Sequence, residues 1–294
     1  MISLLAAPVF VFLWSTGFIV ARAITPYVDP NLYLLARFAG TTLLFVAIAL
    51  VTRAPWPKGR DIGRHLFAGA LLQGVYLGAG YWAVAQGLGA GVMALLGALQ
   101  PLLTAAVAAR LFGERLSPRA WGGLVLGLIG VALVLAPKIV GGGAHVAQAG
   151  TGHAPQWLVV TIAVLSVVAI TAGTLYQKTS LARADIRSAS AVQNAGAAIV
   201  ALVLVAVLGE HRFIASTTTW IALAWGILML SGVATTLLVW MVRRGAASRA
   251  TALLFLAPPL AALESYVAFG ETLNAVQLAG FAAALAGVLL ARSK

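Results

Sequence analysis

Two charged residues, Arg37 and Glu264, lie inside apolar stretches that are long enough to cross a lipid bilayer. A charge at the centre of a membrane helix costs about 2.5–3.5 kcal/mol on insertion scales, so it usually has a partner or a function. Both lie about five or six residues from the same predicted membrane face, and we predict an ion pair or a shared polar cluster there. A static structural pair, or separate snorkelling to the interface, is the alternative.

The other candidate carboxylates differ from Glu264 in depth. Glu264 is the only carboxylate that the sequence places deep in the membrane, and proton coupling through it therefore stays open. Glu114 and Glu271 lie in short Phe-Gly-Glu turns. There we expect them to hold the turn or to cap the next helix.

Proline interrupts two of the apolar stretches near their middles. Pro101 and Pro258 each remove a backbone hydrogen bond and free a carbonyl one turn earlier. In lipid that carbonyl must be satisfied again, so such a break faces protein or a cavity. Broken helices at mid-membrane form the binding sites of many transporters, and Gln100 adds a polar amide beside Pro101. We predict that these three residues line a cavity; kinks that only aid packing, with Gln100 bonded to a neighbouring helix, are the alternative.

Aromatic side chains are the third kind of candidate. Trp14, Tyr76 and Trp82 lie within apolar stretches and not at their ends. If they face a cavity, their rings can stack on an aromatic substrate or on a cation. Ordinary packing is the alternative for each of them.

No residue pattern indicates covalent catalysis, a metal site or a cofactor. The chain has no cysteine, and its four histidines are scattered over connecting segments. The glycines at Gly141-Gly142-Gly143 are not followed by the Lys-Ser/Thr of a phosphate-binding loop. We therefore expect no catalytic residue, no metal, no cofactor and no use of ATP. A membrane enzyme would need a catalytic constellation near one surface, and the sequence shows none.

The elements that must position the candidate residues are membrane helices. Hydrophobic residues make up 62% of the 294 positions and charged residues only 9%, whereas soluble domains carry about 25% charged residues. The formal net charge of +12 does not indicate nucleic acid binding, because Lys and Arg stand in short clusters between apolar runs. We predict an all-α integral membrane protein that contacts the lipid bilayer and binds no nucleic acid.

The chain also contains a second copy of itself. A constant shift of 157 positions aligns Pro101 with Pro258, Phe112-Gly113-Glu114 with Phe269-Gly270-Glu271, and Gly130 with Gly287. At a shift of 156 positions, one fewer, the four residues from Arg37 to Gly40 can be matched with those from Gln193 to Gly196, so that Gln193 takes the place of Arg37. Self-similarity over half the chain indicates a duplicated fold.

Each copy supplies five apolar spans, and the basic residues orient them. With the N-terminus inside, fifteen of the 19 Lys and Arg residues fall on the cytoplasmic side, three fall outside and one is Arg37. This bias follows the positive-inside rule and puts both termini in the cytoplasm. Because five is odd, the second copy enters the membrane upside down, as in many secondary transporters. The ten predicted spans are approximately 3–21, 31–51, 66–86, 92–111, 120–136, 156–177, 188–208, 219–241, 250–269 and 274–291.

We therefore expect ten transmembrane helices in two inverted five-helix repeats. The first repeat covers 1–137 and the second, inverted repeat covers 156–294. Between them, 138–155 is rich in glycine and alanine and is predicted to be a flexible outer linker.

These features resemble the drug/metabolite transporter (DMT) superfamily, and specifically its EamA-type ten-helix members. The resemblance covers nearly the whole chain, and within the superfamily the sequence looks most like the YddG-type aromatic amino acid exporters. It implies the EamA/DMT fold and alternating access between two five-helix halves. The residues that carry it are Trp14, the first-copy Pro101, Gly113-Glu114, Gly122, Gly123 and Gly130, and the second-copy Pro258, Gly270-Glu271, Gly280 and Gly287.

The resemblance implies a secondary transporter that exports amino acids, including aromatic ones, or related small metabolites across the inner (plasma) membrane. We expect a monomer whose small-molecule substrate enters a cavity. A transporter of another substrate class (drug or cation, sugar, nucleotide-type metabolite) and a channel are the alternatives. The predicted cavity residues are Trp14, Arg37, Tyr76, Trp82, Gln100, Pro101, Pro258 and Glu264.

Overall fold

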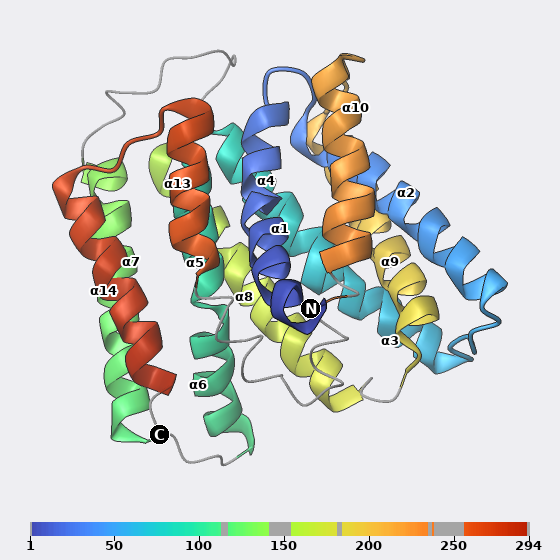
Figure 1. Ribbon diagram of the computed structural model, residues 1–294, viewed down its shortest axis with the longest axis horizontal. Helices are drawn as coiled ribbons and strands as arrows, with labels where there is room; N and C mark the ends of the chain where they lie inside the picture. Colours follow the sequence, from blue (N-terminus) through green and yellow to red (C-terminus); the bar gives the residue numbers. More distant parts are fainter. Residues whose placement is uncertain are drawn as a thin grey trace.

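The protein is a bundle of helices that run up and down past one another (Figure 1). The computed structural model describes residues 2–112, 117–140, 154–180, 184–234, 237 and 256–292, and all regular elements in these residues are helical. This agrees with the predicted all-α class. The elements are α1 (Ile2–Ile24), α2 (Pro30–Val51), α3 (Arg60–Gly69), η1 (Ala70–Val75), α4 (Tyr76–Ala85), α5 (Ala90–Ala98), α6 (Gln100–Phe112), α7 (Pro118–Val140), α8 (Gln156–Ser180), α9 (Ile186–Leu208), α10 (Thr217–Ala224), η2 (Trp225–Ala234), α13 (Ala257–Phe269) and α14 (Ala275–Arg292).

Several of these helices are suited to a bilayer. Within the described residues, six stretches are long and apolar enough to cross a membrane, and α1 and α14 hold shorter apolar stretches. The protein is therefore a multi-pass membrane protein. The predicted count of ten spans stays a prediction, because part of the expected eighth and ninth spans lies outside the described residues. The six stretches are Pro30–Val51, Ala90–Arg110, Pro118–Pro137, Gln156–Gln177, Ile186–Leu208 and Thr217–Ala234.

Local sequence signals set where several helices begin. Ser216 precedes α10, and its side chain accepts a hydrogen bond from the Thr219 backbone N–H at 3.2 Å. Asn274 precedes α14 and exchanges two hydrogen bonds with Gln277, which satisfies two backbone N–H groups at once. Pro118 is the first residue of α7, where its missing N–H costs nothing.

Three of the predicted spans are irregular in the middle. The third is one continuous run in which the π-helical η1 joins α3 to α4. The fourth breaks at Leu99, between α5 and α6, and the eighth changes from α10 into the π-helical η2. π-Helical segments are rare and are often found at functional sites. The two π-helical segments also correspond in the sequence repeat, since η1 shifted by 157 positions falls within η2.

Glycines bring helices from the two copies into backbone contact. α7 and α14 lie side by side and run in opposite directions (Figure 1). A Cβ on Gly130 would collide with Gly280 and Ala284, and one on Gly287 would collide with Gly123 and Gly127. Small residues at membrane helix crossings allow such close packing.

The structure describes the second of the two Phe-Gly-Glu turns, and of the first it describes only Phe112. Gly113 and Glu114 lie outside the described residues, so the expectation for Glu114 stays a prediction. In the second turn, Gly270 takes a left-handed conformation with φ of 66° at the C-terminus of α13. Glu271 accepts a hydrogen bond from the Ala90 N–H at 3.1 Å and forms an ion pair with Arg22 at 3.3 Å. The expected cap is thus made on α5 and not on the next helix, α14, because Asn274 and Gln277 already cap α14.

Candidate functional site

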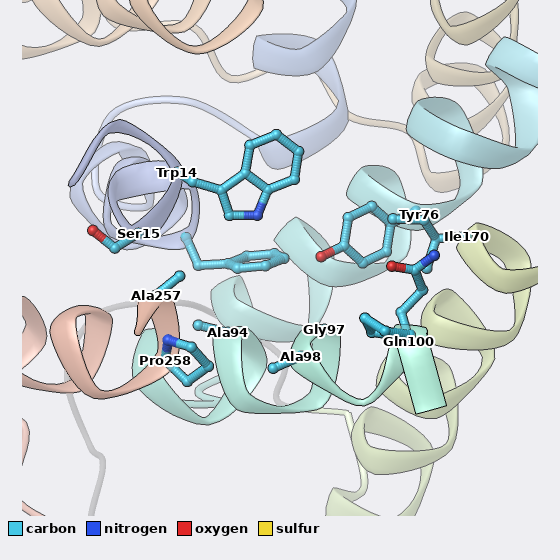
Figure 2. Close-up of a pocket in the computed structure, with 12 residues that line it drawn as sticks. Trp14, Ser15, Tyr76, Ala94, Gly97, Ala98, Gln100, Ile170, Ala257 and Pro258 are labelled. Atoms are coloured by element: carbon cyan, nitrogen blue, oxygen red, sulfur yellow. The ribbon is translucent and has the colours of Figure 1, made fainter. Parts of the chain in front are cut away.

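A small cavity lies where the two proline-bearing helices meet α1. Its volume is about 70 Å³. Figure 2 shows α1 on one side, α5 and the start of α6 below, Tyr76 opposite Trp14, and Pro258 at the start of α13. The lining residues are Trp14, Ser15, Phe18, Tyr76, Ala94, Gly97, Ala98, Gln100, Pro101, Ile170, Ala257 and Pro258.

The breaks in the helices create this cavity. Pro101 lies in the first turn of α6 and Pro258 in the first turn of α13, so both helices begin at the cavity and not beyond it. The first turn of a helix exposes backbone N–H groups and carries a partial positive charge. Both helix starts therefore contribute a positive potential to the same small space. Small residues of α5 (Ala94, Gly97, Ala98) leave this space open.

Aromatic rings form one wall of the cavity. Phe18 meets Tyr76 edge to face, with 6.0 Å between ring centroids. The Tyr76 hydroxyl lies against Gly97, where a Cβ would come within 2.7 Å of the oxygen. Trp14 keeps 42% of its surface exposed and projects its indole over the cavity (Figure 2). Such rings can take up a flat apolar or aromatic group.

The polar groups of the cavity come from opposite sides. The Gln100 amide donates to the Thr174 hydroxyl of α8 at 2.9 Å and contacts the Thr104 hydroxyl at 3.4 Å. On the other side, the Ser15 hydroxyl donates to Oε1 of Glu264 at 2.7 Å. The second carboxylate oxygen of Glu264 is buried and has no hydrogen-bond partner in the part of the chain that the structure describes. A carboxylate therefore lies one side chain behind the cavity wall.

The structure brings together five of the eight predicted cavity residues and leaves three outside. Trp14, Tyr76, Gln100, Pro101 and Pro258 line the cavity. Glu264 reaches it only through Ser15, and Trp82 is half-buried against the hydrophobic core. Arg37 lies in a separate polar cluster. Binding of a substrate by any of these residues remains a prediction.

The predicted pair between Arg37 and Glu264 is wrong for the conformation described here. In the described part of the chain the two side chains bind different partners: Glu264 binds Ser15, and Arg37 binds Tyr81 and Ser231. Equal depth in the membrane did not imply contact, because Glu264 faces α1 from α13, whereas Arg37 faces α4 and η2 from α2.

The Arg37 cluster is buried more deeply than the cavity. Arg37 is 6% exposed; Nη1 donates to the Tyr81 hydroxyl at 3.2 Å and Nη2 to the Ser231 hydroxyl at 3.4 Å. The Tyr81 hydroxyl in turn donates to the Gly17 carbonyl of α1 at 2.8 Å. Tyr81 also contacts Phe18, with ring centroids 6.0 Å apart, so one layer of side chains separates the cluster from the cavity.

Sequence reasoning missed Ser15 and Phe18, although both flank the predicted Trp14. Ser15 carried a usable signal, because it is a polar residue next to a candidate aromatic residue inside an apolar span. Phe18 lies one helical turn from Trp14 and so shares its face. Among the described residues, no group of three or more His, Cys, Asp or Glu side chains is placed to hold a metal ion.

Comparison with known proteins gives the family and the fold. The profile described as the EamA-like transporter family matches residues 1–136 and 157–293. A WAT1-related chloroplastic protein of Arabidopsis thaliana, At3g02690, is 25% identical over 288 residues, which are 95% of this chain and 66% of that protein. The chain thus spans just under two thirds of that relative's length. One crystal structure matches 98% of this chain and 95% of its own with a TM-score of 0.66, at 23% identity.

Proposed function

Because the chain belongs to the EamA-like transporter family, we propose that it exports amino acids, including aromatic ones, or closely related metabolites by alternating access. The observation that carries this proposal is the cavity, which combines an aromatic wall, two helix N-termini and a nearby carboxylate. An amino acid has matching parts: an ammonium group for Glu264, an apolar side chain for the rings, and a carboxylate whose approach the positive potential of the helix N-termini favours.

The volume of the cavity supports a transport cycle with more than one conformation. Pockets that hold drug-sized ligands measure about 300–1,000 Å³. The cavity here, at about 70 Å³, holds only a few water molecules. In the proposed cycle the cavity therefore widens when it opens to one side of the membrane. The breaks at Leu99 and before α13 supply places where the flanking helices can move.

The proposed topology of the protein is two inverted repeats of five spans, with both termini in the cytoplasm. The protein is proposed to lie in the inner membrane as a monomer. The repeats are taken as 1–137 and 156–294, with 138–155 as the linker. Three observations support inversion. The glycine contacts between α7 and α14 correspond in the sequence repeat, η1 and η2 correspond in the same way, and α6 and α13 end at opposite sides of the bundle (Figure 1).

Glu264 is proposed as the group that couples transport to protons. Its Oε2 is buried and unpartnered, and its Oε1 contacts the cavity residue Ser15. The same carboxylate also favours one competing function, the export of organic cations, because a cation can bind between Glu264 and the aromatic wall. The two functions differ in whether the substrate needs a carboxylate.

Counterflow exchange in proteoliposomes tests the proposal. Vesicles loaded with individual amino acids are assayed for uptake of labelled phenylalanine. A parallel assay measures exchange of the organic cation tetraphenylphosphonium. We expect saturable exchange of phenylalanine. Trp14→Ala should raise the KM for phenylalanine by about tenfold, because an aromatic contact contributes roughly 1.5 kcal/mol to binding. Trp157→Ala, at an exposed tryptophan at the start of α8, is the matched control and should change nothing.

The proposal fails if no amino acid in the panel exchanges. Exchange of tetraphenylphosphonium alone would establish the cation function in its place. If Trp14→Ala and Trp157→Ala lower transport equally, the cavity is not where the substrate binds. Flux that does not saturate and shows no counterflow would identify a channel.

A further inference from the structure

Arg37 is a buried cation that pairs with no carboxylate in the described part of the chain. Guanidinium groups keep their charge in proteins and have five N–H donors. Arg37 is 6% exposed, and its two hydrogen bonds, at 3.2 and 3.4 Å, go to the neutral hydroxyls of Tyr81 and Ser231. Its Nε is buried and has no acceptor among the described residues. An arginine in this state bears a desolvation cost that no carboxylate offsets.

The carboxylates of the described residues are all engaged elsewhere. Asp29, Asp61, Asp185 and Glu271 pair with arginines other than Arg37, Glu210 binds the start of α2, and Glu264 binds Ser15. Glu114 is the one further carboxylate in the sequence, and it lies outside the described residues. The counter-charge of Arg37 is therefore absent from the part of the chain that the structure describes.

The groups around Arg37 offer donors to an incoming ligand. Thr41 lies one helical turn along α2, is fully buried, and its hydroxyl has no partner. Ser231 presents a second hydroxyl from η2. With the Nε–H of Arg37, these hydroxyls make a group of donors on two helices. Such a set matches an anion, and the planar guanidinium matches a carboxylate in particular.

A purely structural role does not need the charge. Gln193 holds the equivalent repeat position on α9, is neutral, and bonds the neutral side chains of His65 and Gln177. The scaffold is therefore satisfied by a polar residue at this position. The positive charge of Arg37 is an addition that the packing of the helices does not explain.

The geometry points to Arg37, with Thr41 and Ser231, as the docking point for a carboxylate group of the transported molecule. This inference rests on the proposed function, and it names the part of the substrate that the protein recognises. The cluster lies one layer from the cavity, behind Phe18 and Tyr81. The cluster reaches α1 through the Tyr81 hydroxyl, which donates to the Gly17 carbonyl.

Thermal unfolding of the purified full chain in detergent tests the inference without transport. The probes are L-phenylalanine, L-phenylalaninamide, sodium acetate and sodium chloride at matched ionic strength. We expect phenylalanine and acetate to raise the Tm, and phenylalaninamide and chloride to do so much less. Arg37→Gln should weaken the apparent affinity for both carboxylates by about tenfold or more, because it removes a charge-assisted hydrogen bond. Arg64→Gln, at an exposed arginine of α3, is the charge-matched control and should respond like the natural protein.

The ligand-free Tm of Arg37→Gln separates a binding role from a structural one. Removing an uncompensated buried charge should leave the Tm unchanged or raise it by about 2 °C. A Tm that falls by several degrees would show that Arg37 stabilises the fold and would overturn the inference. An unchanged carboxylate response in this variant, no response in the natural protein, or an equal response to chloride would overturn it as well.

The two proposals fail in different ways. If acetate protects through Arg37 but no amino acid exchanges in proteoliposomes, the carboxylate site stands and the amino acid assignment is wrong. If phenylalanine exchanges and Arg37→Gln leaves its KM unchanged, the transport function stands and the carboxylate site is wrong.

Discussion

The helices α2 and α9 hold the same position in the two copies of the sequence, yet their polar residues have different surroundings. Arg37 of α2 lies against Gly226 of η2, and the carbonyl of Gln193 of α9 lies against Gly69 of α3. Gly69 and Gly226 are 157 positions apart and Arg37 and Gln193 are 156 apart, and the contacts differ: Gly226 meets side-chain atoms of Arg37, whereas Gly69 meets backbone atoms of Gln193. Gln193 completes its site with neutral partners, His65 at 3.3 Å and Gln177 at 3.5 Å. The two halves thus carry a charged side chain and a neutral side chain at the same repeat position.

The starts of these two helices differ in the same way. α9 is capped locally, because the side chain of Asp185 accepts the Arg187 N–H at 2.9 Å. α2 is capped from the other half of the chain, where Glu210 accepts the N–H groups of Asn31 at 2.7 Å and Leu32 at 3.0 Å. Asp29, the residue before α2, accepts the backbone N–H groups of His211 and Arg212 and pairs with Arg212. The Arg37-bearing helix is thus held at its start by the second half of the chain.

Placing a charge in the neutral half should have the largest effect. Gln193→Arg puts a buried cation where the partners are His65 and Gln177, neither of which is a carboxylate. We expect a loss of about 3 kcal/mol in the free energy of unfolding, close to the cost of a charge inside a membrane helix. Thermal unfolding in detergent measures it. A variant as stable as the natural protein would mean that both halves accept a charge, and the contrast between them would carry no functional meaning.

The two glycines should differ when each is changed to alanine. A Cβ on Gly69 would collide with the backbone of Gln193, so a helix must move. A Cβ on Gly226 would lie 2.7 Å from the Tyr33 hydroxyl and 2.9 Å from Cδ of Arg37, and both are side-chain atoms that can shift. We expect Gly69→Ala to destabilise by about 3 kcal/mol and Gly226→Ala by about 1 kcal/mol. Unfolding of the two variants side by side checks this order, and equal losses would contradict it.

Removing the two caps should have a smaller effect, again unequal between the halves. Glu210→Ala leaves the Asn31 and Leu32 N–H groups and the Asn31 amide without their acceptor. We expect this to lower the free energy of unfolding by about 2 kcal/mol. Asp185→Ala removes the hydrogen bond that caps α9 and should lower the free energy of unfolding by about 1 kcal/mol. Hydrogen exchange at the first turns of α2 and α9 localises each loss. If Glu210→Ala did not speed exchange in α2, the cap between the halves would have no energetic weight.

The smallest effect should be a dependence on pH through Glu210. Burial raises the pKa of the Glu210 carboxyl above 4.5, and hydrogen bonds from Asn31 and Leu32 offset part of that rise. The folded protein therefore holds this proton more tightly than the unfolded chain does. The contribution of Glu210 to stability is full at low pH and declines as the pH rises through the raised pKa. The Tm of Glu210→Gln relative to the natural protein should increase from about pH 4.5 upward; a flat difference would contradict the assignment.

Local signals in the sequence predicted most of the helices and part of the site. The breaks around Gly87–Gly91 and at Pro101, and the starts at Pro118, Ser216 and Asn274, follow from the backbone limits of proline and glycine and from side-chain caps. Trp14, Tyr76, Gln100, Pro101 and Pro258 were chosen as residues that are costly or unusual in lipid, and they converge on one cavity. The same reasoning could not decide whether Arg37 pairs with Glu264. The depth of a residue in the membrane does not show which neighbouring helix its side chain contacts.

The sequence by itself determined that this protein is helical, lies in a membrane and repeats one unit twice, because hydropathy and the positions of proline, glycine and the caps act over a few neighbouring residues. Only the tertiary structure decided which helices cross at their glycines, that Glu264 binds Ser15, and that Arg37 is buried without a counter-charge from the residues that the structure describes. The physical reason is that the partner of a buried polar group depends on the rotation of its helix and on residues far away in the chain. The repeat, at a local shift of 156 positions, could predict that Arg37 and Gln193 correspond. Only the packed structure shows that, among the described residues, Arg37 keeps an unpartnered Nε while the Gln193 amide has partners.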